Sequence, residues 1–68
     1  DKYIQDAMNE IPPAFREVVV LRDIQQLAYD EIAEITGLPM GTVKSRINRG
    51  RTKLQSLLED VYPFQDES

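Results

Sequence analysis

Apolar residues recur along this 68-residue chain at the three- and four-residue spacing of amphipathic helices. The first stripe, in residues 3–11, consists of Ile4, Ala7, Met8 and Ile11. Pro12 and Pro13 stop that helix and are able to begin another, because proline is tolerated in a first helical turn. The pattern therefore predicts a short helix followed at once by a second one.

Residues 14–24 are dense in apolar side chains and include three consecutive valines at positions 18–20. A run of β-branched residues favours a strand. However, Phe15, Val18 and Val19 have helical spacing, and the chain offers no second segment as a partner strand. We therefore predict a buried helix here, with residues 25–28 as the connection to the next element.

The remaining pattern predicts two more helices. Tyr29, Ile32, Ala33 and Thr36 form the third stripe. Gly37 fits the left-handed position that closes a helix, and residues 38–40 form a turn. The fourth helix begins near residue 41 or 42 and runs to about residue 60, where Tyr62 and Pro63 end it. The fold class is then an all-α, four-helix domain over residues 1–62, with a flexible tail at 63–68.

The predicted fourth helix separates apolar from polar residues by angle. At ~100° per residue, one arc within about 60° of Val43 holds Ile47, Gly50, Leu54, Leu57, Leu58 and Val61. The opposite side holds Ser45, Asn48, Arg49 and Thr52. Lys44 and Arg51 flank one edge of that polar side, and Arg46 and Lys53 flank the other. We expect the apolar arc to pack on the domain, with Gly50 letting another helix approach closely.

The net charge of −4 conceals an uneven distribution of charged residues. Residues 1–43 carry three basic and eight acidic residues, and residues 54–68 carry four acidic residues and no basic one. Residues 44–53, by contrast, carry five basic residues and no acidic one. This asymmetry indicates a local anion-binding surface on an otherwise acidic domain.

A short helix, a turn containing glycine and a helix with a basic polar face form the helix-turn-helix arrangement. In a major groove, the central polar groups reach base edges and the flanking cations reach the phosphates. Arg49 would bind a guanine and Asn48 an adenine, while the backbone N–H groups of Gly41 and Thr42 suit a phosphate. The pattern leaves one plainer alternative open, a solvated face on a structural helix.

Other classes of function are disfavoured by what the chain lacks. It has no Cys and no His, so we expect neither a cofactor nor a catalytic or metal site. The carboxylates of Asp30, Glu31 and Glu34 are typical of a solvated helix surface. No apolar run reaches the ~18 residues of a membrane span, so we expect no membrane partner. We also expect a cytoplasmic protein with no small-molecule partner. Because the chain begins at Asp1 rather than Met, we expect it to be a fragment.

Three stretches of the chain resemble region 4 of bacterial RNA polymerase sigma factors, above all the extracytoplasmic-function (ECF) group. They are residues 11–18 (IPPAFREV), residues 29–35 (YDEIAEI) and residues 39–46 (PMGTVKSR), the last followed by Arg49-Gly50-Arg51. The resemblance covers about residues 4–60, and the string GTVKSR with the following Arg-Gly-Arg is its most specific part.

This resemblance implies binding to the minus-35 promoter element while the core RNA polymerase holds the domain. It also implies an apolar concavity in the first helices that docks the flap of the polymerase β subunit, and an anti-sigma protein as a further partner. By position in the family motif, base contacts would come from Lys44, Ser45, Asn48 and Arg49. The angular positions given above place Lys44 at an edge of the polar side instead. Phosphate contacts would come from Gly41, Thr42, Arg46, Arg51, Thr52 and Lys53.

The chain departs from the family pattern at two positions. Ala28 stands where relatives often have a Ser or Thr that caps the third helix, and a missing cap costs about 1 kcal/mol, which predicts a looser turn. Asn48 stands where relatives often have His or an aromatic residue, so a relative's promoter preference does not transfer. Region 2, which reads the minus-10 element in this family, is not among these 68 residues, so we expect no initiation by this chain alone.

Two alternatives to promoter reading stay open in the sequence. One is a protein-interaction module that docks the polymerase flap or an anti-sigma protein through Phe15, Val18, Val19 and Leu21. The other is the helix-turn-helix output domain of another transcription regulator, which would need a dimerising helix. The acid-rich stretch after Leu58 is poorly suited to that role.

Overall fold

The computed structural model describes residues 2–59, and every regular element in that range is a helix. The elements are α1 (Lys2–Glu10), α2 (Pro13–Val19), the π-helical turn η1 (Val20–Ile24), α3 (Tyr29–Thr36) and α4 (Met40–Glu59). The predicted all-α fold class is confirmed. The predicted helix end at Tyr62 and Pro63 and the predicted tail at 63–68 lie outside the described residues.

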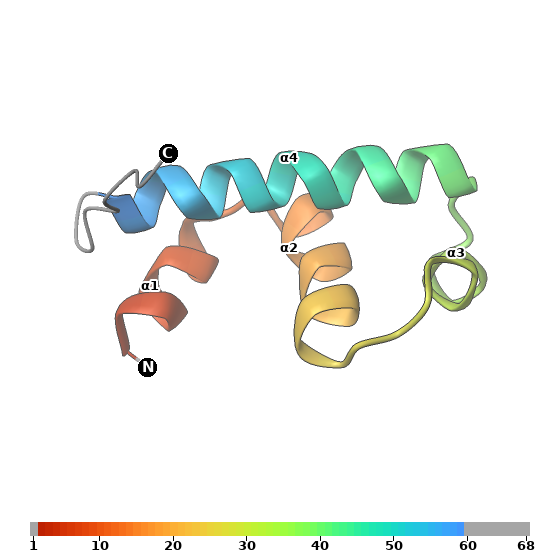
Figure 1. Cartoon of the computed structure of the whole chain (residues 1–68), viewed down its shortest axis with the longest axis horizontal. Coiled ribbons are helices and arrows are strands. Elements are labelled where there is room, and N and C mark those ends of the chain that lie inside the picture. The colour runs from red at the N-terminus through yellow and green to blue at the C-terminus, as the bar shows by residue number, and fades with distance from the viewer. Residues whose placement is uncertain (1, 60–68) are drawn as a thin grey trace, which may run out of the picture.

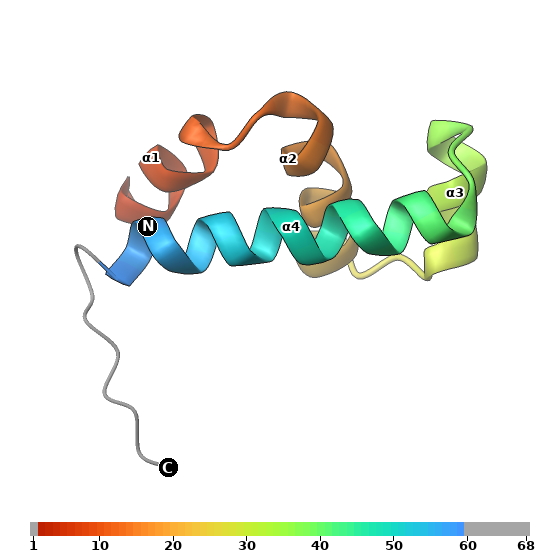
Figure 2. The same cartoon turned by 90° about the horizontal axis from the view of Figure 1, so that it is seen from above.

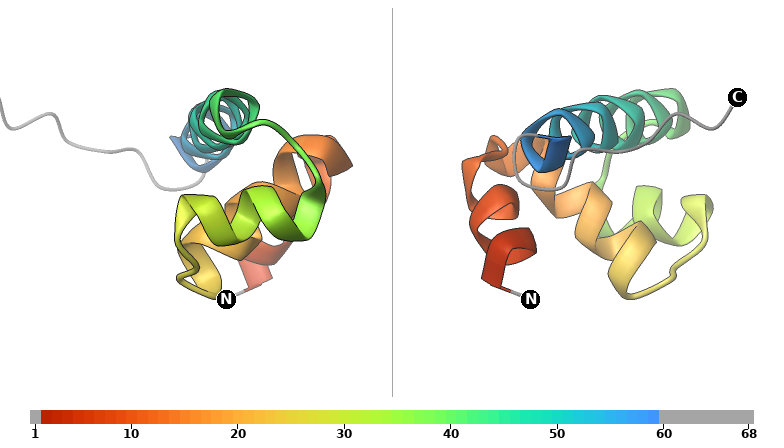
Figure 3. Two further views of the ribbon diagram at one scale, coloured as in Figure 1. Left: turned by 90° about the vertical axis from the view of Figure 1, so that its right-hand side faces the viewer. Right: turned by 60° about the vertical axis from the view of Figure 1, so that its left-hand side comes forward.

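α4 is the longest element, and the shorter helices attach to it (Figure 1). α1, α2 and α3 all lie on the same side of α4, as the views in Figures 1 and 3 agree. Seen from above in Figure 2, α1 lies beside the C-terminal end of α4 and α3 beside its N-terminal end. The opposite side of α4 is left uncovered by the other described helices.

The core divides into two clusters that α4 joins. Val18, Ile32, Val43 and Ile47 form the first cluster, between α2, α3 and α4. Met8, Ile11 and Val19 form the second, with Leu54 and Leu57 of α4 packed against it. The neighbouring Val18 and Val19 thus belong to different clusters. The apolar arc predicted for the fourth helix is confirmed for its members up to Leu58, which are all buried or half-buried.

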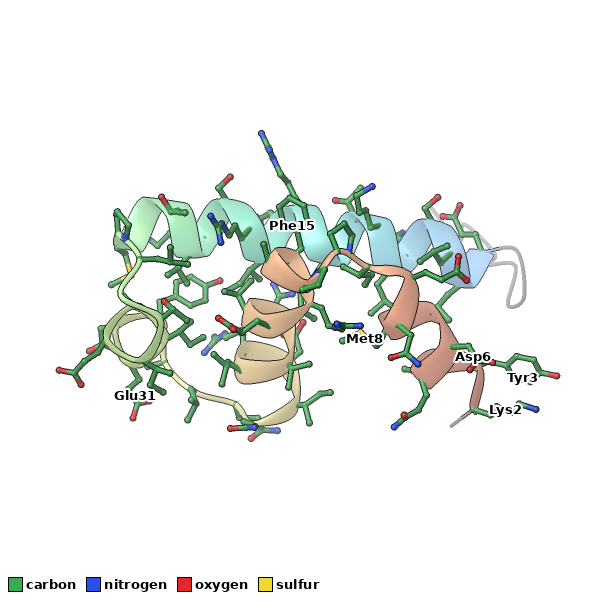
Figure 4. All side chains as sticks on the ribbon, turned by 180° about the vertical axis from the view of Figure 1, so that it is seen from behind. Lys2, Tyr3, Asp6, Met8, Phe15 and Glu31 are labelled. Carbon is green, nitrogen blue, oxygen red and sulfur yellow. The ribbon has the colours of Figure 1, made fainter. Side chains whose placement is uncertain are left out.

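α2 lies very close to α4 at Gly50. A Cβ atom built on Gly50 would lie 2.5 Å from Cγ2 of Val19 and 3.2 Å from the backbone oxygen of Phe15. Figure 4 shows Phe15 lying against α4. The prediction that Gly50 permits a close helix approach is therefore confirmed.

The structure of residues 14–24 differs in two respects from the single buried helix that we predicted there. α2 ends at Val19, and the chain continues as the π-helical turn η1, in which the Gln25 N–H donates to the Val20 oxygen at 3.0 Å. Ile24 is 64% exposed, so the apolar stripe does not stay buried to its end. The wider turn rotates the last residues away from the direction that a 3.6-residue period predicts.

The turn between α3 and α4 has the predicted conformation. Gly37 has φ 75°, and its N–H donates to the Ala33 oxygen at 2.8 Å, which closes α3 with a left-handed residue. The Thr36 hydroxyl donates to the Ile32 oxygen at 2.7 Å. These bonds fix the direction in which the chain enters α4.

The backbone N–H groups at the start of α3 have more hydrogen-bond partners than the missing cap at Ala28 suggested. The Ala28 N–H donates to the Glu31 carboxylate at 2.8 Å, and the Glu31 N–H donates to Oδ1 of Asp30 at 3.0 Å. Acidic side chains of the first turn therefore replace part of what a capping hydroxyl would supply.

Replacement of Gly50 by alanine tests the close approach of α2 and α4. We expect Gly50→Ala to lower the free energy of unfolding by roughly 1–3 kcal/mol, because the new methyl group overlaps Val19 and the backbone at Phe15. Urea denaturation followed by circular dichroism measures this. Gly41→Ala is the matched control: its Cβ would meet nothing within 4 Å, so its stability should stay equal or rise. Equal stability of Gly50→Ala and wild type would contradict the packing described here.

Candidate nucleic-acid interface

α3, the turn at Gly37 and α4 form a helix-turn-helix whose second helix presents its polar side away from the core. Val43, Ile47 and Gly50 are buried against the other helices. The predicted central residues of the opposite side, Ser45, Asn48, Arg49 and Thr52, are all exposed. The predicted separation of apolar and polar residues on opposite sides of this helix is therefore present in the structure.

The N-terminal half of this surface brings several predicted contact residues together. A shallow cavity of about 360 Å³ beside α4 is lined by Ala14, Phe15, Gly41, Thr42, Ser45, Arg46 and Arg49. Within α4, the first ladder bond runs from the Val43 N–H to the Pro39 oxygen at 3.0 Å. The N–H groups of Gly41 and Thr42 precede that bond and point out of the helix start, where the helix dipole favours an anion.

Farther along α4, Thr52 uses its hydroxyl hydrogen within the helix. Its Oγ1 donates to the Asn48 oxygen at 2.9 Å. A phosphate oxygen needs a donor, so Thr52 as positioned here is committed to the backbone rather than to an anion. Asn48, Arg49 and Lys53 stand exposed around it.

The edge of α4 that carries Lys44 meets two residues that sequence reasoning did not single out. Lys44 Nζ lies 5.8 Å from the centroid of the Tyr29 ring, and Arg22 Cζ lies 4.8 Å from the same centroid. Arg22 also donates from Nη1 to the Leu27 oxygen at 2.8 Å, which ties η1 to the start of α3. The Tyr29 ring is thus in cation–π contact with two cations, one from η1 and one from α4. Arg22 and Tyr29 were missed because they come from other helices, and no local spacing links them to Lys44.

Arg51, predicted as a phosphate contact, is paired with a carboxylate from η1. Its Nε donates to Oδ2 of Asp23 at 2.8 Å, and its Nη2 contacts Oδ1 of the same side chain. The hydrogen bond from Arg51 holds the pKa of the Asp23 carboxyl below its usual value, and the same bond raises the pKa of Arg51. Both side chains are partly exposed, at 43% for Arg51 and 37% for Asp23.

Two further findings concern other kinds of site. Among residues 2–59, no group of three or more Asp or Glu side chains is placed to hold a metal ion. No helix in the same range is both long and apolar enough to span a bilayer.

The Asp23–Arg51 pair predicts a pH-dependent contribution to stability. Since the Asp23 pKa is lowered on folding, the pair stabilises the fold above the unfolded value of about 3.9 and is lost as the pH falls through the folded value. We expect Asp23→Asn to cost about 0.2–1 kcal/mol at pH 7, as for other exposed pairs, and less at about pH 2. Urea unfolding at both pH values measures the difference, and an equal cost at both would contradict the assignment.

Comparison with known proteins gives a consistent result. The family model described as "Sigma-70, region 4" matches residues 1–54. The chain is 49% identical over 55 residues to the ECF RNA polymerase sigma factor SigE of Mycolicibacterium smegmatis, covering 81% of this chain and 21% of that protein. It is 45% identical over 58 residues to the ECF RNA polymerase sigma factor SigW of Bacillus subtilis, covering 85% of this chain and 31% of that protein.

A third relative, the ECF RNA polymerase sigma-E factor of Haemophilus influenzae, is 32% identical over 61 residues, or 90% of this chain and 32% of that protein. The chain therefore spans between a fifth and a third of the length of these relatives. The family also agrees with the expectation that the chain is not an enzyme. With its helix-turn-helix, its outward polar side on α4 and these matches, the chain belongs to the sigma-70 region 4 family of ECF RNA polymerase sigma factors.

Proposed function

We propose that the chain reads the minus-35 element of promoter DNA by placing α4 in the major groove. The observation that carries this proposal is the uncovered side of α4, where Ser45, Asn48 and Arg49 are exposed along one line, opposite the buried Val43 and Ile47. The other described helices all lie on one side of α4, below it in Figure 1, so a duplex that approaches from the opposite side would meet α4 first. A protein with this role works in the cytoplasm.

Within this proposal, Lys44, Ser45, Asn48 and Arg49 contact base edges. Arg49 has the planar fork that binds guanine O6 and N7 together, and Asn48 has the donor and acceptor pair that suits adenine N6 and N7. Both side chains are exposed on adjacent positions of α4. Sequence discrimination then depends mainly on these two residues.

The phosphates are bound by groups at the start and the edges of α4. Gly41 and Thr42 offer backbone N–H groups at the helix start, and Arg46 and Lys53 lie along one edge. Thr52 takes part only if its hydroxyl leaves the Asn48 oxygen. These contacts set register and affinity but carry no base preference. Because the rest of the chain is acidic, we expect weak binding by the isolated domain.

Replacement of Arg49 by alanine tests this function. We expect Arg49→Ala to weaken binding to a selected minus-35 duplex by about 1–3 kcal/mol and to remove the preference at one base pair. Fluorescence anisotropy at two salt concentrations, with selected and scrambled duplexes, measures both effects. Gln55→Ala is the matched control, because Gln55 is exposed on α4 but follows the basic stretch. Binding without sequence preference, unchanged in Arg49→Ala, would contradict the proposal.

RNA polymerase is the second partner that the family implies, and the structure offers it a separate surface. A shallow groove of about 220 Å³ between α1 and the α2–η1 segment is lined by Ile4, Gln5, Met8, Asn9, Arg16, Val20 and Ile24. Ile4 is 42% exposed and Ile24 is 64% exposed. We propose that this groove docks the flap of the polymerase β subunit, with an anti-sigma protein as the competing occupant.

The residues that line this groove differ from the docking residues that we expected from the sequence. Val18 and Val19 are fully buried in the two core clusters, so they offer no surface to a partner. The exposed apolar side chains come instead from α1 and from η1. Because α1 and α2 lie below α4 in Figure 1, away from its uncovered side, a polymerase segment in the groove and a duplex on that side would not compete for space.

A charged substitution in the groove tests the docking surface. We expect Ile24→Glu to weaken association with purified core RNA polymerase by roughly tenfold, because apolar anchors dominate such interfaces. Biolayer interferometry measures this, and anisotropy should show unchanged DNA binding. Ile35→Glu is the matched control, since Ile35 is equally exposed at 63% but lies on α3, outside the groove. Equal loss for both variants would contradict a specific groove.

A further inference from the structure

The ion pair between Arg51 and Asp23 places a carboxylate on the surface that we propose binds phosphates. Arg51 is one of the five cations in residues 44–53, the stretch that carries no acidic residue of its own. The carboxylate that meets it comes from η1, 28 positions away in the chain. No carboxylate among residues 2–59 is in contact with Arg46, Arg49 or Lys53. One cation of the stretch is therefore paired with a carboxylate of the same domain, whereas Arg46, Arg49 and Lys53 are not.

The contact has the form that arginine uses for a phosphate. Nε and Nη2 of Arg51 meet the two oxygens of one carboxylate, with 2.8 Å between Nε and Oδ2. A guanidinium fork binds two oxygens of a phosphate in the same side-by-side manner. While Asp23 holds this fork, the matching N–H groups are not offered to DNA.

The position of the pair keeps Arg51 within reach of a duplex. Arg51 follows Lys44 by seven residues, which is about two helical turns, so both lie on the same edge of α4. Both members of the pair remain partly exposed, at 43% and 37%. Without the carboxylate, the exposed Arg51 fork would therefore be free to bind a phosphate at this edge.

We propose that Asp23 limits the DNA affinity of this domain by occupying Arg51 in the place of a phosphate. The free domain then presents one cation fewer than its sequence suggests, and one acid is kept at the edge of the interface. This inference rests on the proposed function, that α4 binds DNA, and it adds a residue from outside the helix-turn-helix that sets the strength of binding.

Asp23→Asn tests the inference, because it removes the charge and keeps the size of the side chain. At about 0.1 M salt we expect it to bind a selected minus-35 duplex roughly fivefold more tightly. The slope of log affinity against log salt should become steeper by about 0.9, which is the value for one additional phosphate contact. Fluorescence anisotropy over a series of salt concentrations measures both quantities.

Two further variants separate the effect of Arg51 from a general gain of charge. Arg51→Gln in the wild-type background should change affinity by less than about threefold, and in the Asp23→Asn background it should abolish the gain in affinity and slope. Glu34→Gln removes one exposed acid that meets no arginine, so it should leave the slope unchanged. Circular dichroism confirms that each variant is folded.

The possible failures are distinguishable. Selective binding by the wild type, with weaker binding or an unchanged slope in Asp23→Asn, would overturn the role of Asp23 and leave the proposed function intact. Loss of sequence preference together with no effect of Arg49→Ala would overturn the proposed function. Even then, the salt slope for nonspecific duplex would still decide whether Asp23 withholds a cation from the phosphates.

Discussion

The close contact between α2 and α4 at Gly50 is the constraint on which the rest of this domain depends. Only a residue without a Cβ lets the backbone at Phe15 and the side chain of Val19 come so near to α4. That approach places Val18 in one core cluster and Val19 in the other. α4 is thereby buried along Val43, Ile47 and Gly50, and its rotation about its own axis is set. The polar side that faces away is a direct consequence of this packing.

The two edges of the polar side of α4 differ in whether their cations contact other helices. Along one edge, Lys53 is exposed and Arg46 is half-buried, and neither has a carboxylate partner among residues 2–59. Along the other edge, Lys44 lies over Tyr29 and Arg51 is bound to Asp23, so the charges there are partly held by other helices. A chain with net charge −4 thus gathers five cations in a narrow strip of α4, and residues outside that strip are in contact with two of them.

Much of the fold was predictable because its signals are local. The stripes of α1, α3 and α4, the left-handed Gly37 and the small residue at Gly50 each follow from spacing or from the conformational range of one residue. The exposed face of Ser45, Asn48 and Arg49 followed in the same way, since a straight helix with one buried side determines which residues point outward. Ala28 shows the limit of such reasoning, because Asp30 accepts the Glu31 N–H that the missing hydroxyl would have bound, and Glu31 accepts the Ala28 N–H in addition.

The sequence by itself determined the helices, the polar side of α4 and the basic stretch, all of which depend on residues within a few positions of one another. The tertiary structure alone decided the π-helical turn of η1, the exposure of Ile24, the contacts of Tyr29 with Arg22 and Lys44, and the ion pair between Arg51 and Asp23. The last two features join residues from different helices, and a periodic pattern carries no information about which helix will lie beside another. Such contacts exist only once the packing at Gly50 has brought α2, η1 and α4 together.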